Sequence, residues 1–455
     1  MRPEHRSLRE WLAAGKAGRV IRDATRVVAL DDFAPRSGLR AGAAPLIAGR
    51  NVMLAIEDQL TAAAALIELD GLARRIVVCP PGLDLASRAV IATNAGVETI
   101  VIDAETAADA RTALYRLPLA DAAPIDAPFI ATEWALLTSG TSGPPKLAAH
   151  DLSTLTGVMA KAPPPNPAPR WATYYDIRRY GGMQILLRAL TGGDSLTLTH
   201  ASDPIETTLS RLNDSGVTHI TGTPTHWRKV LMSGAARRID PAYVRLSGEI
   251  VDDAVLNGLK SAYPRARIVH AYASTEAGVG FEVTDGEPGF PASLLDARGD
   301  GAVEMRIVDG SLHLRSRRTA LRYIGGNSAP ITTDDGFIDS GDMVERRGDR
   351  YFFTGRRGGV INVGGSKVHP EEVENVINAQ PGVRISLVKA RKNPITGAAV
   401  VADVVIQDGC ADSDALRVRI LDACRAGLAA YKVPMVIRFV PSLEMTPGGK
   451  LARLG

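Results

Sequence analysis

Residues 138–146, with the sequence TSGTSGPPK, have the composition of a loop that contacts phosphate groups. Glycines let backbone N–H groups turn toward phosphate oxygens, hydroxyl side chains add donors, and a lysine supplies a positive charge. The spacing does not match that of a P-loop, so an ordinary surface loop is the alternative interpretation. The candidate phosphate contacts are Thr138, Ser139, Gly140, Thr141, Ser142, Gly143 and Lys146.

A second chemically suggestive segment, HAYASTEAG, occupies residues 270–278 and overlaps the apolar run 267–271. Ligands of parallel α/β sheets bind at the carboxyl ends of strands. There, the ring of Tyr272 could stack on a base, Thr275 could donate to a phosphate and Glu276 could hold Mg²⁺. A plain transition from strand to loop is the alternative.

Three further segments are weaker signals when each is taken alone. Residues 337–342, FIDSGD, predict a tight turn whose Asp342 could accept hydrogen bonds from two ribose hydroxyls. In residues 355–374, glycine pairs flank a short apolar run, and Pro370 with the acids after it predicts the start of a helix. Residues 446–450, TPGGK, end in Lys450, a position more typical of a solvated charge.

Composition excludes several classes of protein. The chain has 455 residues, 45% hydrophobic and 23% charged, with a net charge of +3. A net charge this small does not indicate a protein that binds nucleic acid or a membrane surface through electrostatic attraction. Three cysteines rule out a disulfide framework and suit a reducing compartment. No run of about 18 apolar residues and no signal-peptide core is present, so we expect a soluble cytoplasmic protein.

The elements that must position these residues alternate between strand-like and helix-like patterns, which predicts an α/β fold with largely parallel sheets. Past residue 300, short strands at 302–308, 311–315 and 351–354 predict a small antiparallel unit. The remaining tail predicts a small α+β domain, in which Leu416, Ile420, Cys424 and Leu428 share one helix face. We expect a large N-terminal domain over 1–354, a hinge at 355–358 and a mobile C-terminal domain over 359–455.

Together and in this order, the five segments resemble those of the AMP-forming adenylate enzymes, a family of acyl- and aryl-CoA synthetases, peptide-synthetase adenylation domains and luciferases. The likeness extends over residues 134–450 and is greatest to the smaller bacterial acyl-CoA synthetases. It implies that ATP and a carboxylate form acyl-AMP, and that a thiol then takes the acyl group. The region before the glycine-rich loop is short for the family, so a trimmed N-terminal subdomain is expected.

The resemblance also implies roles for individual residues. Lys146 and its loop would hold the β- and γ-phosphates, Thr275 the α-phosphate and Glu276 the Mg²⁺. Lys450 would bridge the carboxylate and the α-phosphate. The adenosine contacts would be Tyr272 on the adenine, Ser247, Gly248 and Glu249 lining the same pocket, and Asp342 with Arg356 at the ribose.

In the family, the C-terminal domain rotates between the two steps, which would withdraw Lys450 and bring Gly364 and Gly365 toward the thiol. The hinge residue matches Gly358, where the family usually has Asp or Lys. Other departures remove no charged catalytic group: Asn362 stands where many members have lysine, Ser340 replaces a threonine, and Ala271, Ala273 and Leu147 replace glycines.

The acyl pocket is expected around residues 174–184, near His226, and near 273–278. Two alignments of the first stretch differ by two residues. One places Arg178 where many acyl-CoA synthetases carry histidine, and the other places Asp176 where amino-acid-activating domains hold an ammonium group. We favour the first, in which Arg178 suits a polar or second carboxylate group, although it could instead face solvent or pair with acids. The expected pocket residues are Tyr175, Arg178, Tyr180, Gly181, His226, Ala273 and Gly278.

The leading hypothesis is a carboxylate–CoA ligase that uses ATP and Mg²⁺, with coenzyme A as co-substrate. The alternatives are an adenylation enzyme that loads a carrier protein and a nucleotide-binding protein without turnover. We expect a small-molecule carboxylic acid as the substrate and a monomer or homodimer.

Overall fold

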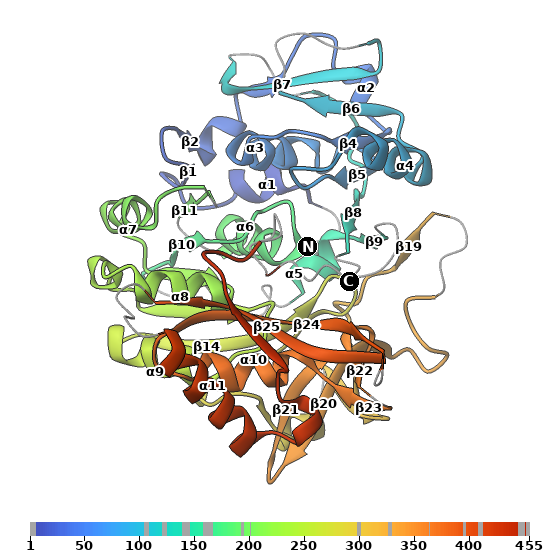
Figure 1. The fold of residues 1–455 in the computed structure, drawn as a ribbon. Helices are drawn as coiled ribbons and strands as arrows, with labels where there is room; N and C mark the ends of the chain where they lie inside the picture. Colours follow the sequence, from blue (N-terminus) through green and yellow to red (C-terminus); the bar gives the residue numbers. More distant parts are fainter. Residues whose placement is uncertain are drawn as a thin grey trace.

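The computed structural model describes residues 6–103, 109–120, 125–138, 146–157, 167–192, 195–200, 202–297, 302–325, 330–363, 365–394, 397–407, 413–444 and 451. Two large sheets with helices between and around them form the body of the molecule (Figure 1). A smaller antiparallel sheet and a C-terminal α+β domain follow. The predicted fold class is confirmed.

The first sheet carries most of the central part of the chain, and its inner strands are parallel. Its edge strands, β15 and β2, are antiparallel to their neighbours. In spatial order it contains β15 (Gly278–Val283), β14 (Arg267–Ser274), β13 (Tyr243–Ser247), β12 (His219–Gly222), β10 (Arg170–Thr173), β11 (Ser195–Leu198), β1 (Val20–Arg22) and β2 (Val27–Ala29).

The second sheet is built from the N-terminal third of the chain and one later strand. Strands β8, β5, β4, β6 and β7 run parallel, whereas β19, β9 and β3 pair antiparallel. In spatial order it contains β19 (Arg322–Ile324), β9 (Leu147–His150), β8 (Glu133–Leu137), β5 (Arg75–Val78), β4 (Asn51–Leu54), β6 (Thr99–Ile102), β7 (Thr112–Ala120) and β3 (Ser37–Leu39).

Helices fill the space between the sheets and cover their outer faces. One continuous core joins side chains of both sheets to the helices between them, α1 (Leu8–Ala13), α3 (Gln59–Leu69), α5 (Leu152–Thr156) and α6 (Tyr180–Gly192). Every residue of α3 is buried, which its run of four alanines permits. The outer faces carry α4 (Leu85–Ala95) on the second sheet and α7 (Ile205–Asp214), α8 (Pro224–Met232) and α9 (Asp253–Ala262) on the first.

The shorter helices are α2 (Ala44–Ile47), η2 (Leu30–Phe33) and η3 (Ala236–Arg238). Among the described residues, no helix has the length and apolar character needed to cross a bilayer.

The predicted antiparallel unit is present as a five-stranded sheet in which β20 was not expected. The segment predicted as a tight turn at 337–342 forms the start of β20, and Gly341, with a φ of 69°, makes the irregularity there. Asp342 is therefore paired within a sheet, opposite Arg356. The sheet contains β16 (Phe290–Pro291), β21 (Arg350–Arg356), β20 (Ile338–Arg347), β18 (Ser311–Arg315) and β17 (Glu304–Val308), with η4 (Ala292–Asp296) beside it.

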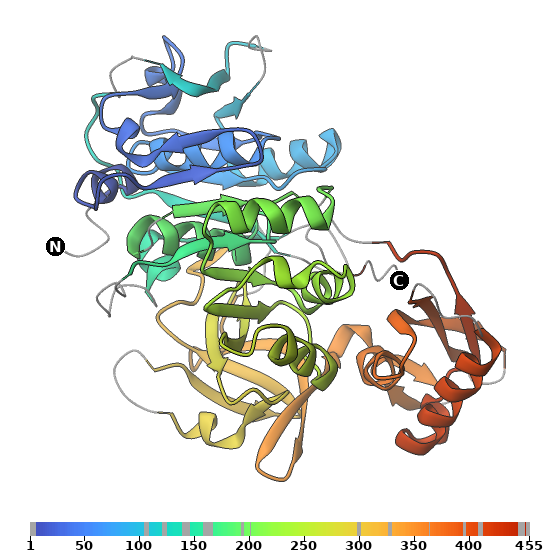
Figure 2. The ribbon, with the colours of Figure 1, turned by 90° about the vertical axis from the view of Figure 1, so that its left-hand side faces the viewer.

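The C-terminal domain has its own hydrophobic core and lies to one side of the body (Figure 2). Leu416, Ile420 and Cys424 are buried on one face of a helix, as the spacing predicted, and Leu428 packs against the same core. The predicted hinge, residues 355–358, consists of the last residues of β21 and the first residues of η5 (Arg357–Gly359).

After it come β22 (Ile361–Val363), β23 (Ser366–Val368), α10 (Pro370–Asn378), β24 (Val383–Asn393), β25 (Gly397–Ile406), α11 (Ser413–Gly427), η6 (Ala430–Lys432) and β26 (Val436–Phe439).

Candidate functional site

The carboxyl end of β14 is the centre of the candidate site, and the second sheet holds it in place. The Nε2 atom of His150, at the end of β9, lies 2.8 Å from the carbonyl oxygen of Thr275. Burial lowers the pKa of His150 to about 4, so the ring is neutral near pH 7. Because a carbonyl only accepts, Nε2 carries the proton, and Nδ1 can accept from the Thr154 hydroxyl at 3.1 Å.

Glu276, the next residue, contacts two other parts of the chain. Its carbonyl accepts a hydrogen bond from the backbone N–H of Ala320 at 2.8 Å. Its Oε1 atom accepts one from the Tyr323 hydroxyl at 3.2 Å. The ammonium of Lys146 lies 5.0 Å from the centre of the Tyr323 ring, within the range of a cation–π contact. Tyr323 thus contacts both Lys146 and Glu276, two of the predicted site residues.

Sequence reasoning missed Tyr323. It lies in the three-residue strand β19, and it comes close to Lys146 because Tyr323 pairs with Ala148 of β9. That pairing joins segments far apart in the chain, and nothing in the local sequence around residue 323 signals it.

A second group of predicted residues meets at Asp342. Its Oδ2 accepts from the Tyr272 hydroxyl at 2.6 Å and its Oδ1 from Nε of Arg356 at 2.9 Å. Burial raises the pKa of Tyr272 well above its usual value, and the Asp342 charge adds to this effect. The Tyr272 ring stacks on Phe281 and Phe353, with centroids 5.6 and 5.3 Å away. The expected contact of Tyr272 with adenine stays a prediction.

The segment at the end of β13 supplies the other expected adenosine contacts. The carbonyl of Ser247 accepts from the Tyr175 hydroxyl at 2.9 Å, which joins this segment to the start of the expected acyl pocket. Gly248 has a φ of 85°, a conformation that favours glycine. Glu249 accepts a hydrogen bond from the backbone N–H of Thr225, in the first turn of α8, at 2.9 Å.

A narrow cavity of about 20 Å³ opens beside Ala273, between α6 and the first sheet. Its walls include four of the expected pocket residues and the buried side chain of Arg245, which sequence reasoning missed. The lining residues are Tyr175, Tyr180, Gly181, Gln184, Ile185, Thr221, Arg245, Ser247, Ala273 and Val279.

Two expected pocket residues have roles in the fold. His226 caps α8 through Thr223 and stacks on Tyr174 at 5.5 Å, and burial lowers its pKa to about 4. Gly278 has a φ of 75°, and a Cβ atom there would come within 2.6 Å of the Arg318 carbonyl. These residues shape the surroundings of the cavity and do not line it.

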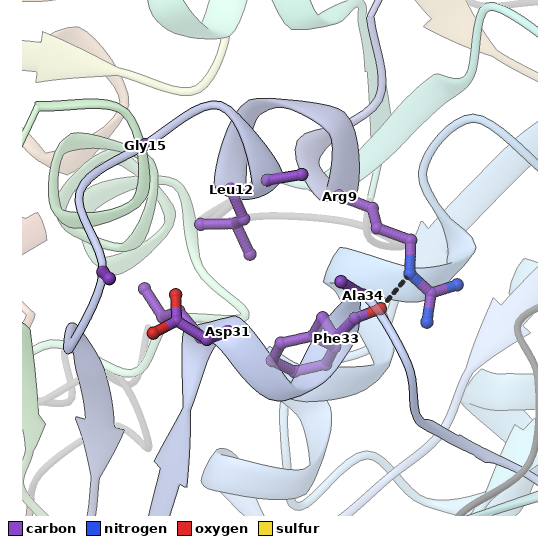
Figure 3. A pocket seen from close by; sticks show the side chains of 9 residues that line it. Arg9, Leu12, Gly15, Asp31, Phe33 and Ala34 are labelled. Atoms are coloured by element: carbon purple, nitrogen blue, oxygen red, sulfur yellow. Dashed lines mark hydrogen bonds between the residues drawn. The ribbon is translucent and has the colours of Figure 1, made fainter.

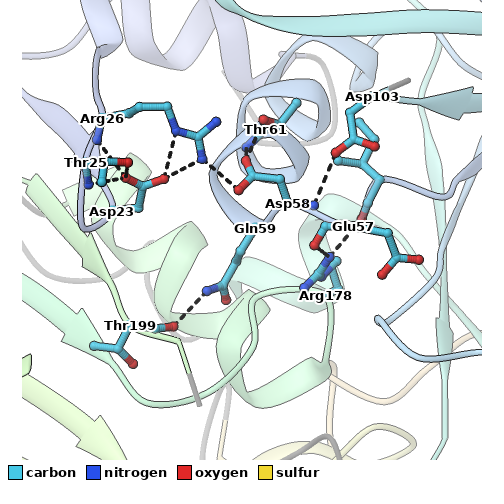
Figure 4. A network of polar contacts seen from close by, with 11 residues as sticks. Asp23, Thr25, Arg26, Glu57, Asp58, Gln59, Thr61, Asp103, Arg178 and Thr199 are labelled. Carbon is cyan, nitrogen blue, oxygen red and sulfur yellow. Dashed lines mark hydrogen bonds and ion pairs between the residues drawn. The ribbon is translucent and has the colours of Figure 1, made fainter. Parts of the chain in front are cut away.

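Arg178 does not line this cavity, and it pairs with an acid, which was the alternative left open by the sequence. Its side chain is 2% exposed and forms a two-point pair with Asp176, at 2.8 and 2.6 Å. Its remaining nitrogen donates to the carbonyl of Ile56 at 2.8 Å and to that of Glu57 at 2.6 Å (Figure 4). The guanidinium therefore joins the segment between β10 and α6 to the loop after β4, and both Arg178 and Asp176 are committed to this pair.

A larger cavity, of about 220 Å³, lies between α1 and η2 (Figure 3). All its lining residues fall within 9–34, and none of them is a predicted site residue. It is separate from the site at β14.

Several predicted residues lie outside the described part of the chain: Ser139, Gly140, Thr141, Ser142, Gly143, Gly364 and Lys450. The ends of the glycine-rich loop are described, and the N–H of Thr138 donates to the carbonyl of Lys146 at 2.9 Å. Gly358 lies in η5, and Gly365 has a φ of 87°. Within the described ranges, no three His, Cys, Asp or Glu side chains are grouped to hold a metal ion.

Comparison with known proteins gives two family matches. The model of the AMP-binding enzymes matches residues 52–313, and that of the AMP-binding enzyme C-terminal domain matches 372–450. The chain is 28% identical to a 2-succinylbenzoate–CoA ligase of Salmonella typhimurium, over 70% of this chain and 66% of the relative. It is 31% identical to a feruloyl-CoA synthase of an Amycolatopsis species, over 60% and 57% of the two chains.

The chain spans about half to two thirds of the length of such curated relatives. Among solved structures, the anthranilate CoA ligase AuaEII in complex with anthranoyl-AMP has a TM-score of 0.80. It is 18% identical, with 99% of this chain and 96% of that chain covered. At this identity the likeness shows a shared fold.

We predict that His150 makes the stability of the fold sensitive to acid. Its pKa is lowered from 6.5 to about 4, so its contribution is complete above pH 6.5 and is lost as the pH falls from 6.5 through 4. The full loss corresponds to about 3 kcal/mol. In His150→Gln, an amide N–H replaces the Nε2 donor without titrating. Its thermal unfolding midpoint should therefore fall less than that of the wild type between pH 7.5 and 4.5.

The control is His200→Gln, because His200 is exposed. This variant should follow the wild-type acid dependence. Equal acid sensitivity in His150→Gln and the wild type would contradict the assignment.

For Arg178→Ala, we expect a loss of stability of about 3–5 kcal/mol, because the Asp176 carboxylate would remain in place without its partner. The thermal unfolding midpoint of the purified variant measures this loss. Arg237→Ala, at an exposed arginine, is the matched control and should leave the midpoint unchanged. An unchanged thermal unfolding midpoint in Arg178→Ala would contradict the structural role and make Arg178 a candidate ligand contact again.

Proposed function

The chain belongs to the family of AMP-binding enzymes, whose model covers more than half of it, and we propose that it is an AMP-forming carboxylate–CoA ligase. The observation that carries this proposal is the meeting of Lys146, Glu276 and Tyr323 beside Thr275, at the carboxyl end of β14. The printed names of the relatives support it, because they include 2-succinylbenzoate–CoA ligase and feruloyl-CoA synthase.

In the proposed first step, an oxygen of the substrate carboxylate bonds to the α-phosphorus of ATP, and pyrophosphate leaves. Two anions must approach each other, so positive charge around the phosphates lowers the barrier. Lys146 would supply such a charge, and the Thr275 hydroxyl would donate to the α-phosphate. Lys450 is proposed to bridge the carboxylate and the α-phosphate.

Mg²⁺ would enter with ATP, and the residues present fit it. Mg²⁺ is usually bound through one or two carboxylates together with substrate phosphates. Glu276 offers such a carboxylate: Oε1 accepts from Tyr323, and Oε2 has no hydrogen-bond partner in the described part of the chain. The metal would neutralise charge on the phosphates, while Tyr323 holds the orientation of Glu276.

The adenosine would lie between Asp342 and the segment 247–249. Arg356 and Tyr272 each hold one oxygen of Asp342, which fixes the plane of the carboxylate before a ribose arrives. Each carboxylate oxygen has a further lone pair that can accept a hydrogen bond from a ribose hydroxyl.

In the proposed second step, the thiol sulfur of coenzyme A bonds to the acyl carbon, and AMP leaves. The C-terminal domain would rotate about Gly358 between the steps, and an added Cβ at Gly358 would meet no atom within 4 Å. Gly365 is equally open and would face the incoming thiol. A hinge motion of this kind would let one site carry out both adenylate formation and thioester formation.

We expect one reaction to test the whole proposal. It contains the protein, Mg-ATP, coenzyme A and a pool of aliphatic, aromatic, dicarboxylic and amino acids, and mass spectrometry detects the products. New acyl-CoA masses together with AMP are the expected result. Acyl-AMP without acyl-CoA would indicate a carrier protein as acceptor, and neither product would indicate nucleotide binding without turnover.

Lys450→Ala is the informative variant for that reaction. It should form almost no acyl-AMP from ATP but should still convert supplied acyl-AMP to acyl-CoA. Equal loss of both steps would contradict the proposed rotation.

A change at the ribose contact should affect the nucleotide alone. Asp342→Ala is expected to raise the KM for ATP by about 10- to 100-fold, since it removes charge-assisted hydrogen bonds, and to leave the order of preference among acids unchanged. Steady-state kinetics at varied ATP measure this effect. The control is Asp349→Ala, at an exposed aspartate in the turn between β20 and β21. An unchanged KM in Asp342→Ala would remove Asp342 from the ribose site.

A further inference from the structure

Tyr323 lies against two side chains of opposite charge, Lys146 and Glu276. The Lys146 ammonium lies 5.0 Å from the centre of the ring, and the hydroxyl donates to Oε1 of Glu276 at 3.2 Å. All three residues belong to the described part of the chain, and there the lysine and the glutamate form no ion pair with each other. The phenol group therefore contacts both charges while they remain apart.

Without the ring, these two charges would attract each other directly. The flexible four-carbon stem of a lysine lets its ammonium follow a carboxylate, and an ion pair with Glu276 would occupy both groups. Lys146 would then be lost to the phosphates of ATP, and Glu276 would offer less negative charge to Mg²⁺. A protonated tyrosine carries no net charge, so it contacts each group without neutralising it.

The position of the ring is set by strand pairing. Tyr323 is the middle residue of β19, which pairs with β9. On one side of it, Arg322 forms an ion pair with Glu133 of β8 at 2.5 Å. On the other side, Ile324 packs against the hydrophobic core. Because both neighbours are anchored, the Tyr323 side chain projects from a fixed backbone.

The Tyr323 hydroxyl supplies the proton in its hydrogen bond with Glu276. Burial, together with the charge of Glu276, raises the pKa of Tyr323 above its usual value, so the hydroxyl keeps its proton. Arg356 also interacts electrostatically with both residues, but its hydrogen bonds go to Asp342 and to the carbonyl of Ser340. The orientation of the Glu276 carboxylate therefore depends on Tyr323.

We propose that Tyr323 is a spacer that keeps Lys146 and Glu276 from pairing with each other, so that the lysine stays available to the phosphates of ATP and the glutamate to Mg²⁺. Tyr323 is a positioning residue in this role, because it acts through the other two. The inference rests on the proposed function and deepens it. The ring separates the charges and the hydroxyl orients the carboxylate, so the two parts of the side chain can be tested separately.

Binding of ATP in the presence of EDTA tests the spacer without metal and without turnover. Calorimetric titration measures the dissociation constant. Tyr323→Ala removes the ring and should weaken metal-free binding by about 10-fold, because Lys146 then pairs with Glu276. Tyr323→Phe keeps the ring and should bind metal-free ATP nearly as tightly as the wild type.

Neutralising Glu276 is the decisive comparison. Glu276→Gln removes a negative charge near ATP, so it should strengthen metal-free binding in any background. In Tyr323→Ala the same substitution should also release Lys146, and we expect its gain in affinity to be about 10-fold larger there than in the wild type. A merely structural role of Tyr323 predicts equal gains in the two backgrounds.

The metal requirement gives a second readout. The Mg²⁺ concentration for half-maximal ATP–pyrophosphate exchange should rise by about 10-fold in Tyr323→Ala and by less in Tyr323→Phe, which loses the orienting hydrogen bond alone. Tyr431→Ala is the matched control, because Tyr431 is an exposed tyrosine of the C-terminal domain with the Lys432 ammonium 5.8 Å from its ring centre. It should change neither readout.

Thermal unfolding shows whether each variant is folded. Tyr323→Leu keeps an apolar side chain in β19 but is too short to separate the two charges. It takes the place of Tyr323→Ala throughout the series if the alanine variant does not fold.

The proposal is overturned if the variant without the ring binds metal-free ATP as tightly as the wild type or keeps the wild-type Mg²⁺ requirement. Equal gains from Glu276→Gln in the two backgrounds, or metal-free binding in Tyr323→Phe as weak as in Tyr323→Ala, would also overturn it. Turnover by the wild type without the expected coupling would refute the spacer and leave the ligase activity in place. The expected coupling without acyl-AMP formation would support the spacer and refute the ligase activity.

Discussion

The hydrogen bond from the imidazole of His150 to the carbonyl of Thr275 joins the two large sheets at the candidate site. His150 ends β9, the strand that begins directly after Lys146, and Thr275 directly precedes Glu276. One contact between a buried neutral ring and a backbone carbonyl therefore sets the distance between the glycine-rich loop and the end of β14. The bond is 2.8 Å long, and the His150 ring is buried, where a hydrogen bond is electrostatically stronger than in water.

The remaining parts of the site depend on that junction. Strand β19 pairs with β9, which brings Tyr323 over Lys146 and against Glu276. The antiparallel sheet then places Asp342 and Arg356 side by side, and the Tyr272 hydroxyl reaches Asp342 from β14. Three sheets thus contribute polar groups to one region, and each contribution follows from strand pairing rather than from a flexible loop.

The sequence predicted well those features that local patterns determine. The alternating α/β elements, the antiparallel unit and the helix face at Leu416, Ile420 and Cys424 are all present in the structure. Contacts that depend on lateral pairing were not predictable: Tyr323 needs the register of β19, and Arg245 needs to be known as the cavity-facing residue of β13. The residues around Asp342 were predicted as a turn because Asp, Ser and Gly favour turns, whereas strand pairing with β21 overrides that preference.

Arg178 shows why residue type alone could not identify the charge in the cavity. An arginine near the expected pocket is a reasonable candidate, but its role depends on whether its donors are already used. Those of Arg178 go to Asp176 and two carbonyls, so its contribution is to the fold. Arg245 shares its charge with Glu282 while lining the cavity.

Arg188, on α6, keeps two buried donors without partners in the described part of the chain. Residue type alone therefore does not separate the arginines that support the fold from those whose donors remain available.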